Sequence, residues 1–234
     1  HLSLRRQRQM CIRDRYKSTL QIGGFRIIII LSFYFCFDKD FRMEALKKKI
    51  LAEGEVYEGN ILKVDCFLNH QIDFPFMKEV GREFHRLYKD AGVNKILTIE
   101  ASGIAVGSVV ALEFACPLVF AKKSKTKNIA GDVYKTQVAS FTHGTTYDVM
   151  VSKRFLTPED RVLIVDDFLA VGNALRGLID LVHQSGATLV GCGTVIEKGY
   201  QHGGDQLRAE GVRVESLAIV ESMDHTTGQI CFRD

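Results

Sequence analysis

The stretch that decides the fold class of this chain is Arg161-Val162-Leu163-Ile164-Val165-Asp166-Asp167-Phe168-Leu169-Ala170-Val171-Gly172-Asn173-Ala174-Leu175. It begins with a run of aliphatic residues, which is typical of a strand buried on both faces of a parallel sheet. Two adjacent carboxylates follow, then a loop of small residues, and then the start of a helical pattern. The stretch therefore predicts a strand, a loop and a helix start. Asp166 and Asp167 are expected where the strand ends, at the edge from which open α/β sheets bind ligands.

Composition limits the classes of protein to consider. The chain has 234 residues, 46% hydrophobic and 25% charged, which is ordinary for one globular domain with a full core. Residues 1–42 hold nine lysines and arginines against three aspartates, whereas residues 43–234 hold 22 basic against 25 acidic residues. The larger part is mildly acidic, which argues against a nucleic-acid partner. Neither the six cysteines nor the histidines have the spacing of metal ligands, so we expect no protein metal site and a cytoplasmic location.

Residues 1–42 differ from the rest of the chain. A basic run, residues 5–15, precedes an apolar run, residues 27–37, that is too short to span a bilayer, so no membrane segment is expected. A signal peptide has a similar order of charges, but no small-residue cleavage site follows the apolar run. The basic run also resembles translated sequencing-adapter DNA. We therefore expect residues 1–42 to be a non-native or disordered extension, and residues 43–234 to form the domain. An N-terminus upstream of Met43, measured by mass spectrometry of the natively expressed protein, would contradict this.

From Met43 onward the sequence alternates between helical and strand-like patterns. Strand-like runs occur at residues 55–57, 61–64, 95–99, 117–121, 188–198, 213–218 and 229–232. Helical spacing occurs at residues 43–51, 75–90, 175–184 and 204–211, and a further helix is expected after residues 100–107, through Phe114. This order predicts an α/β fold with a mainly parallel central sheet flanked by helices. Residues 134–142 and 147–151 alternate like the strands of a hairpin, which is expected to protrude from the core as a mobile lid.

Three loops that follow predicted strands have the character of anion sites. Residues 100–107 are small and lead into a helix, so free backbone N–H groups face the loop. Residues 170–174 have the same character. Lys122 and Lys123 begin a run of four lysines in six residues; such a run is usually a solvated turn, but here it follows a strand of the same series and is placed to reach a polyphosphate. The chain has no Walker lysine pattern and no GxGxxG, which disfavours nucleoside-triphosphate hydrolysis and dinucleotide binding.

The paired carboxylates allow several kinds of chemistry. Asp166 and Asp167 are suited to binding a metal, to acid–base catalysis, or to accepting hydrogen bonds from the vicinal hydroxyls of a sugar, and acidic residues also commonly end strands as plain surface turns. Neighbouring residues of an extended chain point in opposite directions. This geometry suits one carboxylate for each hydroxyl, or one for the sugar and one for support.

These motifs carry a family resemblance. Residues 162–174 resemble the phosphoribosyl pyrophosphate signature of type I phosphoribosyltransferases, in which hydrophobic residues, two acids and a small-residue phosphate loop follow one another. From Met43 to the end the chain is similar to the bacterial xanthine phosphoribosyltransferase branch, through residues 43–47, 62–65, 67–73, 98–104, 195–198 and 213–218 in the same order. The resemblance implies a type I phosphoribosyltransferase-like α/β fold with a small hood from the N-terminal part of the domain and a β-hairpin lid.

The resemblance also implies an activity. A pentosyltransferase of this branch transfers 5-phosphoribosyl from phosphoribosyl pyrophosphate, bound with Mg²⁺, to N9 of xanthine in purine salvage, and it acts as a cytoplasmic homodimer. Carried over residue by residue, catalysis is implied for Asp166, Asp167 and Ser140, and xanthine binding for Leu62, Asn69 and Lys198. Phosphoribosyl pyrophosphate binding is implied for Glu100, Ala101, Ser102, Gly103, Ile104, Lys122, Lys123, Asp166, Asp167, Ala170, Val171, Gly172, Asn173 and Ala174.

Two alternatives stay open, and one residue departs from the pattern. The base could be adenine, hypoxanthine or guanine, or the chain could be a regulator that senses phosphoribosyl pyrophosphate; residues 1–42 show no helix-turn-helix periodicity, which argues against a regulator. Many phosphoribosyltransferases have hydroxyl residues where this chain has Val171 and Ala174. Ala174 fits the xanthine branch. Val171 supplies no side-chain hydrogen bond, so the phosphate is expected to depend on backbone amides.

Overall fold

The computed structural model describes residues 18–22, 25–29, 39–123, 131–139 and 146–233. The chain divides into two compact units, His1–Asp38 and Lys39–Asp234. The first unit contains the antiparallel strands β1 (Ser18–Ile22) and β2 (Phe25–Ile29). No helix within the described ranges is both long enough and apolar enough to span a bilayer.

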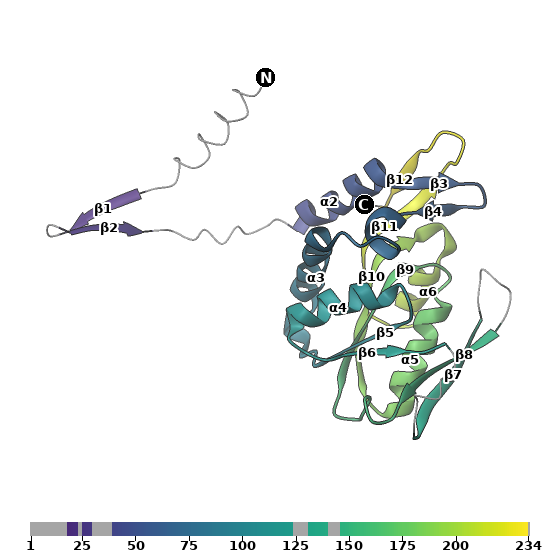
Figure 1. The fold of residues 1–234 in the computed structure, drawn as a ribbon. Helices are drawn as coiled ribbons and strands as arrows, with labels where there is room; N and C mark the ends of the chain where they lie inside the picture. Colours follow the sequence, from purple (N-terminus) through teal and green to yellow (C-terminus); the bar gives the residue numbers. More distant parts are fainter. Residues whose placement is uncertain (1–17, 23–24, 30–38, 124–130, 140–145, 234) are drawn as a thin grey trace. The chain divides into compact units, whose positions relative to one another are not determined.

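The second unit is built on a six-stranded sheet with the order β12-β11-β10-β9-β5-β6 (Figure 1). Five of these strands run parallel and the edge strand β12 runs antiparallel, so the predicted mainly parallel sheet is confirmed. The strands are β5 (Lys95–Ile99), β6 (Leu118–Ala121), β9 (Arg161–Leu169), β10 (Thr188–Lys198), β11 (Val214–Met223) and β12 (Ile230–Phe232). The chain goes outward from β5 to β6 and then returns to the other side of β5. The order therefore reverses between β5 and β9, which is where α/β sheets open their ligand crevice.

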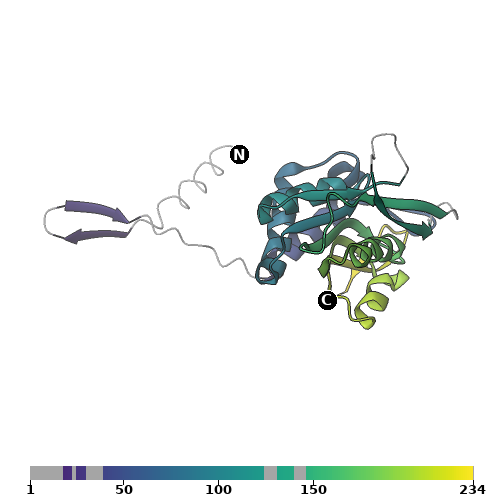
Figure 2. The same cartoon turned by 90° about the horizontal axis from the view of Figure 1, so that it is seen from below.

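Helices cover both faces of this sheet, as Figures 1 and 2 show. The helices α2 (Lys39–Glu53), α3 (Phe74–Tyr88) and α4 (Gly103–Phe114) lie on one side, and α5 (Asn173–Ser185) lies on the other. Leu163 and Val165 of β9 face the core under α3 and α4, while Val162 and Ile164 face the core under α5. Both faces of β9 are buried, which explains its unbroken aliphatic run.

The end of β9 differs from the prediction. The strand was expected to end at the two aspartates, but it stays paired with β10 as far as Leu169. Its pairing with β5 stops earlier, at Ile164. The twist of the sheet lets adjacent strands diverge at their ends, so β9 can leave one neighbour while it follows the other. Asp166 and Asp167 therefore lie in an opening between β5 and β9, which we call the fork.

The predicted hood consists of the first elements of the second unit. After α2 come the short antiparallel strands β3 (Glu55–Tyr57) and β4 (Ile61–Lys63), and then a π-helical turn, Asp65–Asn69. The turn was not predicted: its last residue, Asn69, was expected to begin a polar loop, and residues 65–68 were assigned to no element. Asp73 caps the start of α3, and its side chain accepts a hydrogen bond from the backbone N–H of Phe76 at 3.1 Å.

The predicted hairpin is also present. Strands β7 (Val133–Ala139) and β8 (Thr146–Ser152) pair antiparallel, and β7 packs on α5. Its tip, residues 140–145, lies outside the described residues, and so does Ser140. Lys122 and Met150 exchange backbone hydrogen bonds of 2.9 and 3.0 Å, which join β6 to β8. The remaining elements are the helix α6 (Gly203–Ala209) and the 3-10 turns Lys89–Ala91 and Gly199–Gln201.

Candidate active site

Asp167 connects three segments at the fork. Its Oδ1 accepts a hydrogen bond from the Ser102 hydroxyl at 3.0 Å, and its Oδ2 accepts one from the Asn69 side-chain amide at 3.0 Å. Ser102 belongs to the loop after β5, and Asn69 ends the π-helical turn of the hood. The structure thus brings together residues that the resemblance assigns to the sugar, the pyrophosphate and the base.

Asp166 has different partners. Both aspartates are buried, and the Oδ1 of Asp166 accepts a hydrogen bond from the backbone N–H of Asp167 at 3.0 Å. Burial raises the pKa of the Asp166 carboxyl well above its ordinary value, and the neighbouring Asp167 carboxylate raises it further. Nearby in β5, the fully buried Thr98 hydroxyl has no hydrogen-bond partner among the described residues. The fork therefore contains polar atoms that the protein alone leaves incompletely satisfied.

The loop of residues 100–104 fits tightly against this pair. The peptide bond between Glu100 and Ala101 is cis. A Cβ atom built on Gly103 would lie 2.2 Å from the Thr98 Oγ1 and 2.8 Å from the Asp166 Oδ1, so only glycine fits there. The Glu100 carboxylate accepts a hydrogen bond of 2.6 Å from the backbone N–H of Lys123, which fastens this loop to the end of β6.

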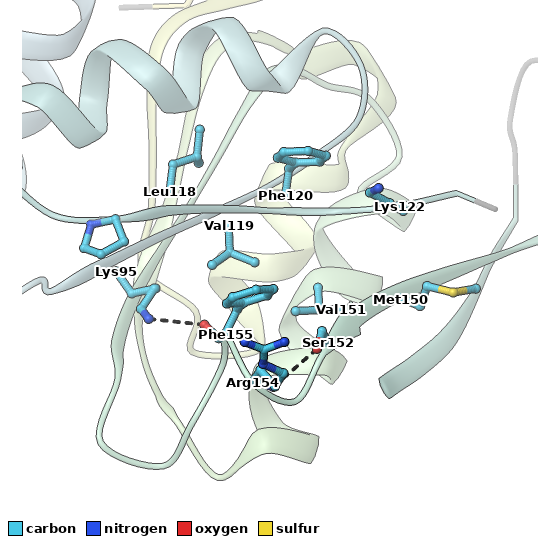
Figure 3. Close-up of a pocket in the computed structure, with 11 residues that line it drawn as sticks. Lys95, Leu118, Val119, Phe120, Lys122, Met150, Val151, Ser152, Arg154 and Phe155 are labelled. Atoms are coloured by element: carbon cyan, nitrogen blue, oxygen red, sulfur yellow. Dashed lines mark hydrogen bonds between the residues drawn. The ribbon is translucent and has the colours of Figure 1, made fainter. Parts of the chain in front are cut away.

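The two predicted lysines point to different places. The Lys123 ammonium lies 5.4 Å from the centre of the Tyr147 ring, and both residues interact electrostatically with Asp166. Lys122 instead lines a groove of about 560 Å³ outside β6, together with Phe120 and residues of β8 (Figure 3). Lys123 therefore belongs to the fork, whereas the structure does not place Lys122 there.

The predicted phosphate loop, residues 170–174, joins β9 to α5. Gly172 has a φ of 88°, and α5 begins at the next residue. The Asn173 side-chain amide donates a hydrogen bond of 3.0 Å to the carbonyl of Ala139, which ties the loop to the end of β7. Val171 is half-buried and adds no polar group. Because the loop precedes a helix, its backbone N–H groups are the natural donors for an anion.

The predicted base side lies at the end of β10. The Lys198 ammonium is 3.5 Å from the Asn60 carbonyl and 5.8 Å from the centre of the Phe168 ring, and burial lowers its pKa. The Tyr200 hydroxyl donates to the same Asn60 carbonyl at 3.1 Å, and burial raises the pKa of Tyr200 to about 12. Thus the turn between β3 and β4 covers the Lys198 ammonium.

Leu62 has a different position from Lys198. Its side chain is buried in the apolar core beneath the hood and is not available to a ligand, and its backbone stands opposite Val56 in the β3–β4 pair. Asn69 is exposed and reaches Asp167.

Sequence reasoning missed the aromatic and hydroxyl groups of the site, Thr98, Tyr147, Phe168 and Tyr200. Two signals were available: Phe168 directly follows the paired aspartates, and Tyr200 stands two residues after Lys198. Tyr147 reaches the fork from the hairpin, about twenty residues before the aspartates, and nothing in the local sequence around it indicates this.

The donor set of the fork fits magnesium carried by a phosphate ligand. Among the described residues, no group of three or more His, Cys, Asp and Glu side chains is arranged to hold a metal ion. Mg²⁺ typically binds through one or two carboxylates together with substrate phosphates. Asp166 and Asp167 supply two carboxylates between two anion loops, which suits such an ion.

Comparisons with known proteins agree with this geometry. A sequence model of the phosphoribosyl transferase domain matches residues 75–221. The xanthine phosphoribosyltransferase of Lachnoclostridium phytofermentans is 56% identical over 191 residues, 82% of this chain and 98% of that protein. The enzyme of the same name from Clostridioides difficile is 56% identical over 186 residues, 79% of this chain and 98% of that protein.

Solved structures show the same fold at lower identity. The crystal structure of an adenine phosphoribosyltransferase from Giardia lamblia, complexed with 9-deazaadenine, has a TM-score of 0.65 at 23% identity and covers 77% of this chain and 98% of its own. The predicted fold class is therefore confirmed. Taken together, the family match over residues 75–221 and relatives of this similarity show that the chain belongs to the type I phosphoribosyltransferase family, in the group of the bacterial xanthine phosphoribosyltransferases.

Proposed function

We propose that the chain transfers the 5-phosphoribosyl group from phosphoribosyl pyrophosphate to N9 of xanthine, giving xanthosine 5′-monophosphate and pyrophosphate in purine salvage. The observation that carries the proposal is the 56% identity to enzymes of this name over 98% of their length. The fork supports it, because two carboxylates lie between two loops suited to phosphate groups.

The reaction breaks the bond between C1 of the ribose and the pyrophosphate oxygen. Positive charge then develops on the sugar ring, and negative charge on the leaving group. Asp166 and Asp167 face the ribose hydroxyls, residues 170–174 hold the 5′-phosphate through backbone N–H groups, and residues 100–104 with Lys123 hold the pyrophosphate. Mg²⁺, when bound with the substrate, neutralises phosphate charge. Positioning and electrostatics therefore account for catalysis without a protein nucleophile.

Water has to be kept from the sugar while charge develops on it, because hydrolysis would waste the substrate. The hairpin is the element suited to this role, and its strand β7 is tied to the phosphate loop through the Asn173 amide and the Ala139 carbonyl. The role proposed for Ser140 lies outside the described residues and stays a prediction.

Base selection is proposed to depend on the hood and the end of β10. Lys198, Asn69 and the backbone at Leu62 surround the place where a purine would meet C1 of the ribose. The Lys198 ammonium suits a carbonyl oxygen of xanthine better than the amino group of adenine, because an ammonium group donates hydrogen bonds and accepts none.

Incubation with phosphoribosyl pyrophosphate, Mg²⁺ and each purine in turn tests the function. Xanthine is expected to give nucleotide faster than hypoxanthine, guanine or adenine, measured by chromatography of the products. A clear preference for hypoxanthine would overturn the substrate assignment. Tight binding of phosphoribosyl pyrophosphate without product from any base would favour a sensor.

The half-buried Val171 gives a prediction for the phosphate loop. Val171→Thr adds a hydroxyl that can donate to the 5′-phosphate, so we expect the Kd for phosphoribosyl pyrophosphate to fall about three- to tenfold, the effect of one added hydrogen bond. Isothermal titration with Mg²⁺ present measures this. The isosteric side chain keeps the shape of the loop, so an unchanged Kd would show that the backbone amides already satisfy the phosphate.

We also propose a homodimer that acts in the cytoplasm. The groove between β6 and β8 exposes the apolar rings of Phe120 and Phe155, which is a surface of the kind that a second copy would cover (Figure 3). The four described cysteines are free thiols, in keeping with a reducing compartment. Light scattering after gel filtration measures the assembly, and a mass of one chain would contradict the dimer.

A further inference from the structure

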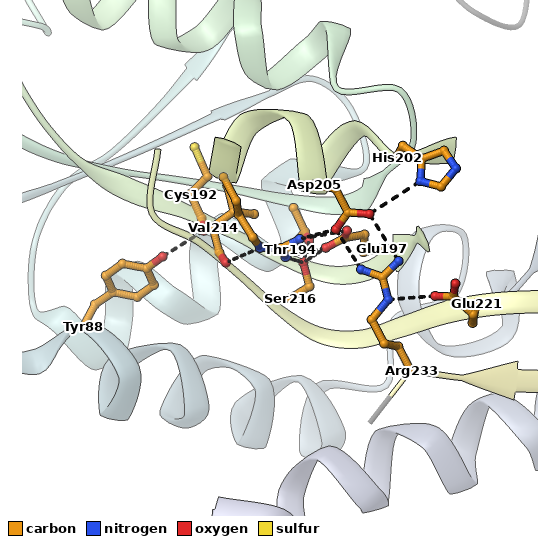
Figure 4. Close-up of polar contacts among 11 residues, drawn as sticks. Tyr88, Cys192, Thr194, Glu197, His202, Asp205, Val214, Ser216, Glu221 and Arg233 are labelled. Carbon is orange, nitrogen blue, oxygen red and sulfur yellow. Dashed lines mark hydrogen bonds and ion pairs between the residues drawn. The ribbon is translucent and has the colours of Figure 1, made fainter. Parts of the chain in front are cut away.

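A buried polar cluster around Glu197 lies between β10, β11 and α6, and Figure 4 shows it together with the neighbouring contacts of Asp205 and Arg233. The Glu197 side chain is fully buried, at 0% exposure. The Arg208 guanidinium donates one hydrogen bond to each of its oxygens, at 3.1 Å to Oε1 and 2.6 Å to Oε2. The Ser216 hydroxyl donates a further bond to Oε2. A two-pronged pair of this kind fixes the orientation of both partners as well as their distance.

The cluster also fastens α6 to its surroundings. Arg208 donates from Nε to the Val214 carbonyl at 3.1 Å, so the same side chain bridges β10 and β11. Asp205, one turn earlier on α6, pairs with Arg233 at 2.7 Å, and Arg233 pairs with Glu221 of β11 at 2.7 Å. Asp205 and Arg208 lie on the same face of α6, so the position of the helix is set by the ion pairs that this face makes with Glu197 and Arg233.

The start of α6 is packed between this cluster and the phosphate loop. A Cβ atom on Gly204 would lie 2.2 Å from the Glu197 Oε1, and a Cβ atom on Gly203 would lie 2.1 Å from the Ala170 carbonyl oxygen. The main chain of Gly203 and Gly204 thus packs directly against the Glu197 carboxylate on one side and against the phosphate loop on the other. In the sheet, the backbone of Glu197 pairs with Leu169, the residue before the loop.

We propose that Glu197 is a positioning residue for the phosphoribosyl pyrophosphate site. Through Arg208 and the Gly203–Gly204 segment it holds residues 170–174 in their binding conformation before the ligand arrives. A loop that is already ordered loses less conformational entropy on binding, so the affinity for the ligand is higher. The inference rests on the proposed function, because it assumes that this loop binds the 5′-phosphate.

The alternative is that the Glu197–Arg208 pair serves folding alone, and the same chain offers a matched control. Glu83 on α3 is also buried, at 3% exposure, and the Arg86 guanidinium donates to its two oxygens at 2.6 and 2.9 Å. That pair lies on a helix outside the phosphate loop. Glu197→Gln and Glu83→Gln both turn an acceptor facing an arginine into a donor, so their structural effects are comparable.

The test compares these two variants with the unmodified full chain. We expect Glu197→Gln to raise the Kd for phosphoribosyl pyrophosphate about tenfold, the lower end of what supporting residues behind a binding shell contribute. The KM for xanthine should change less than the KM for phosphoribosyl pyrophosphate. Glu83→Gln should lower the Tm and leave the Kd for phosphoribosyl pyrophosphate unchanged. Titration calorimetry with Mg²⁺, steady-state kinetics and thermal unfolding give the three readouts.

Two further variants keep the test decisive. Arg208→Lys keeps the charge but only part of the two-pronged contact with Glu197. Its Kd for phosphoribosyl pyrophosphate should therefore lie between those of Glu197→Gln and Glu83→Gln. Ser216→Ala removes the hydroxyl that donates to Glu197 and also contacts Thr194 and Arg208, while it keeps the Glu197–Arg208 pair. It replaces Glu197→Gln if that variant does not fold. Equal effects of Glu197→Gln and Glu83→Gln, limited to the Tm, would overturn the inference. An unmodified chain that binds phosphoribosyl pyrophosphate but makes no nucleotide would overturn the proposed function instead. The two failures are distinguishable, because the Kd values of the variants are measured without nucleotide formation.

Discussion

Gly103→Ala is expected to lower kcat/KM for phosphoribosyl pyrophosphate by more than about 100-fold, on the scale of a misplaced reacting group. The added methyl group would lie 2.2 Å from the Thr98 Oγ1 and 2.8 Å from the Asp166 Oδ1. Thr98 stands in a central strand and Asp166 is buried, so neither can yield. The first turn of α4 has to lift instead. That movement separates Ser102 from Asp167 and displaces the loop of residues 100–104. Steady-state kinetics with varied phosphoribosyl pyrophosphate measure the loss.

A second glycine of the same helix provides the control. A Cβ atom on Gly107 would lie 2.8 Å from a terminal methyl group of Leu118, a side chain that can rotate. Overpacking costs about 1–3 kcal/mol in either case, which corresponds to roughly 2–4 °C of Tm for each kcal/mol in a chain of this size. Gly107→Ala should show that loss of stability with little loss of activity. If Gly103→Ala retained full kcat/KM, the close fit of the loop would have no part in binding.

Asp166→Asn is expected to stabilise the free protein while it lowers activity sharply. Burial and the neighbouring Asp167 raise the pKa of the Asp166 carboxyl, so an ionised Asp166 destabilises the folded state. An amide of the same shape removes that charge. We expect the free energy of unfolding at pH 8 to rise by about 1 kcal/mol and the Tm by about 2–4 °C. Catalysis should fall by about 100-fold or more, because a carboxylate aimed at the ribose is lost. Thermal unfolding without ligand and steady-state kinetics measure the two effects.

The effect of Asp166→Asn on the Tm should depend on pH. A carboxyl group whose pKa is raised in the folded state stabilises that state at low pH, below its unfolded pKa of about 3.9. This stability is lost as the pH rises toward the folded pKa. The Tm advantage of Asp166→Asn should therefore grow as the pH is raised from 5 to 8.

Asp167→Asn should behave in the opposite way, since both Asp167 oxygens accept hydrogen bonds from Ser102 and Asn69. The N–H₂ group of the new amide would face one of those donors without an acceptor between them, so the Tm should fall. A Tm advantage of Asp166→Asn that became smaller toward pH 8 would show that burial does not destabilise the ionised Asp166 carboxyl.

Local sequence patterns were sufficient to predict most of the helices and strands. The aliphatic runs predicted β5 and β10 with the bounds that the structure has, since a strand buried on both faces leaves little choice of period. The family resemblance implied the mainly parallel sheet but not the order of its strands. The sequence also did not predict the point where β9 leaves β5, because strand divergence depends on twist and on residues far apart in the sequence. For the same reason the paired aspartates were expected after the strand and lie within it.

The candidate site was predictable where its residues share one loop. Residues 100–104 and 170–174 each follow a strand and precede a helix, so their character could be read locally. Lys122 and Lys123 could not be told apart, because the turn after β6 sends adjacent side chains to different surfaces. Glu197 escaped notice because its partners, Arg208 and Ser216, come from two later elements. Such clusters follow from tertiary packing, which no short motif encodes.

The hood and the sheet differ in how many contacts a local change disturbs. Residues near the proposed base site, such as Asn60 and Asn69, stand in a turn and at the end of a short helical segment near the beginning of the second unit. Substitutions there alter one contact at a time. In β9, a shift of one residue would turn every side chain to the opposite face. A change in the hood can therefore alter a single proposed contact to the base, whereas a shift within β9 would displace both aspartates and the loop that follows them.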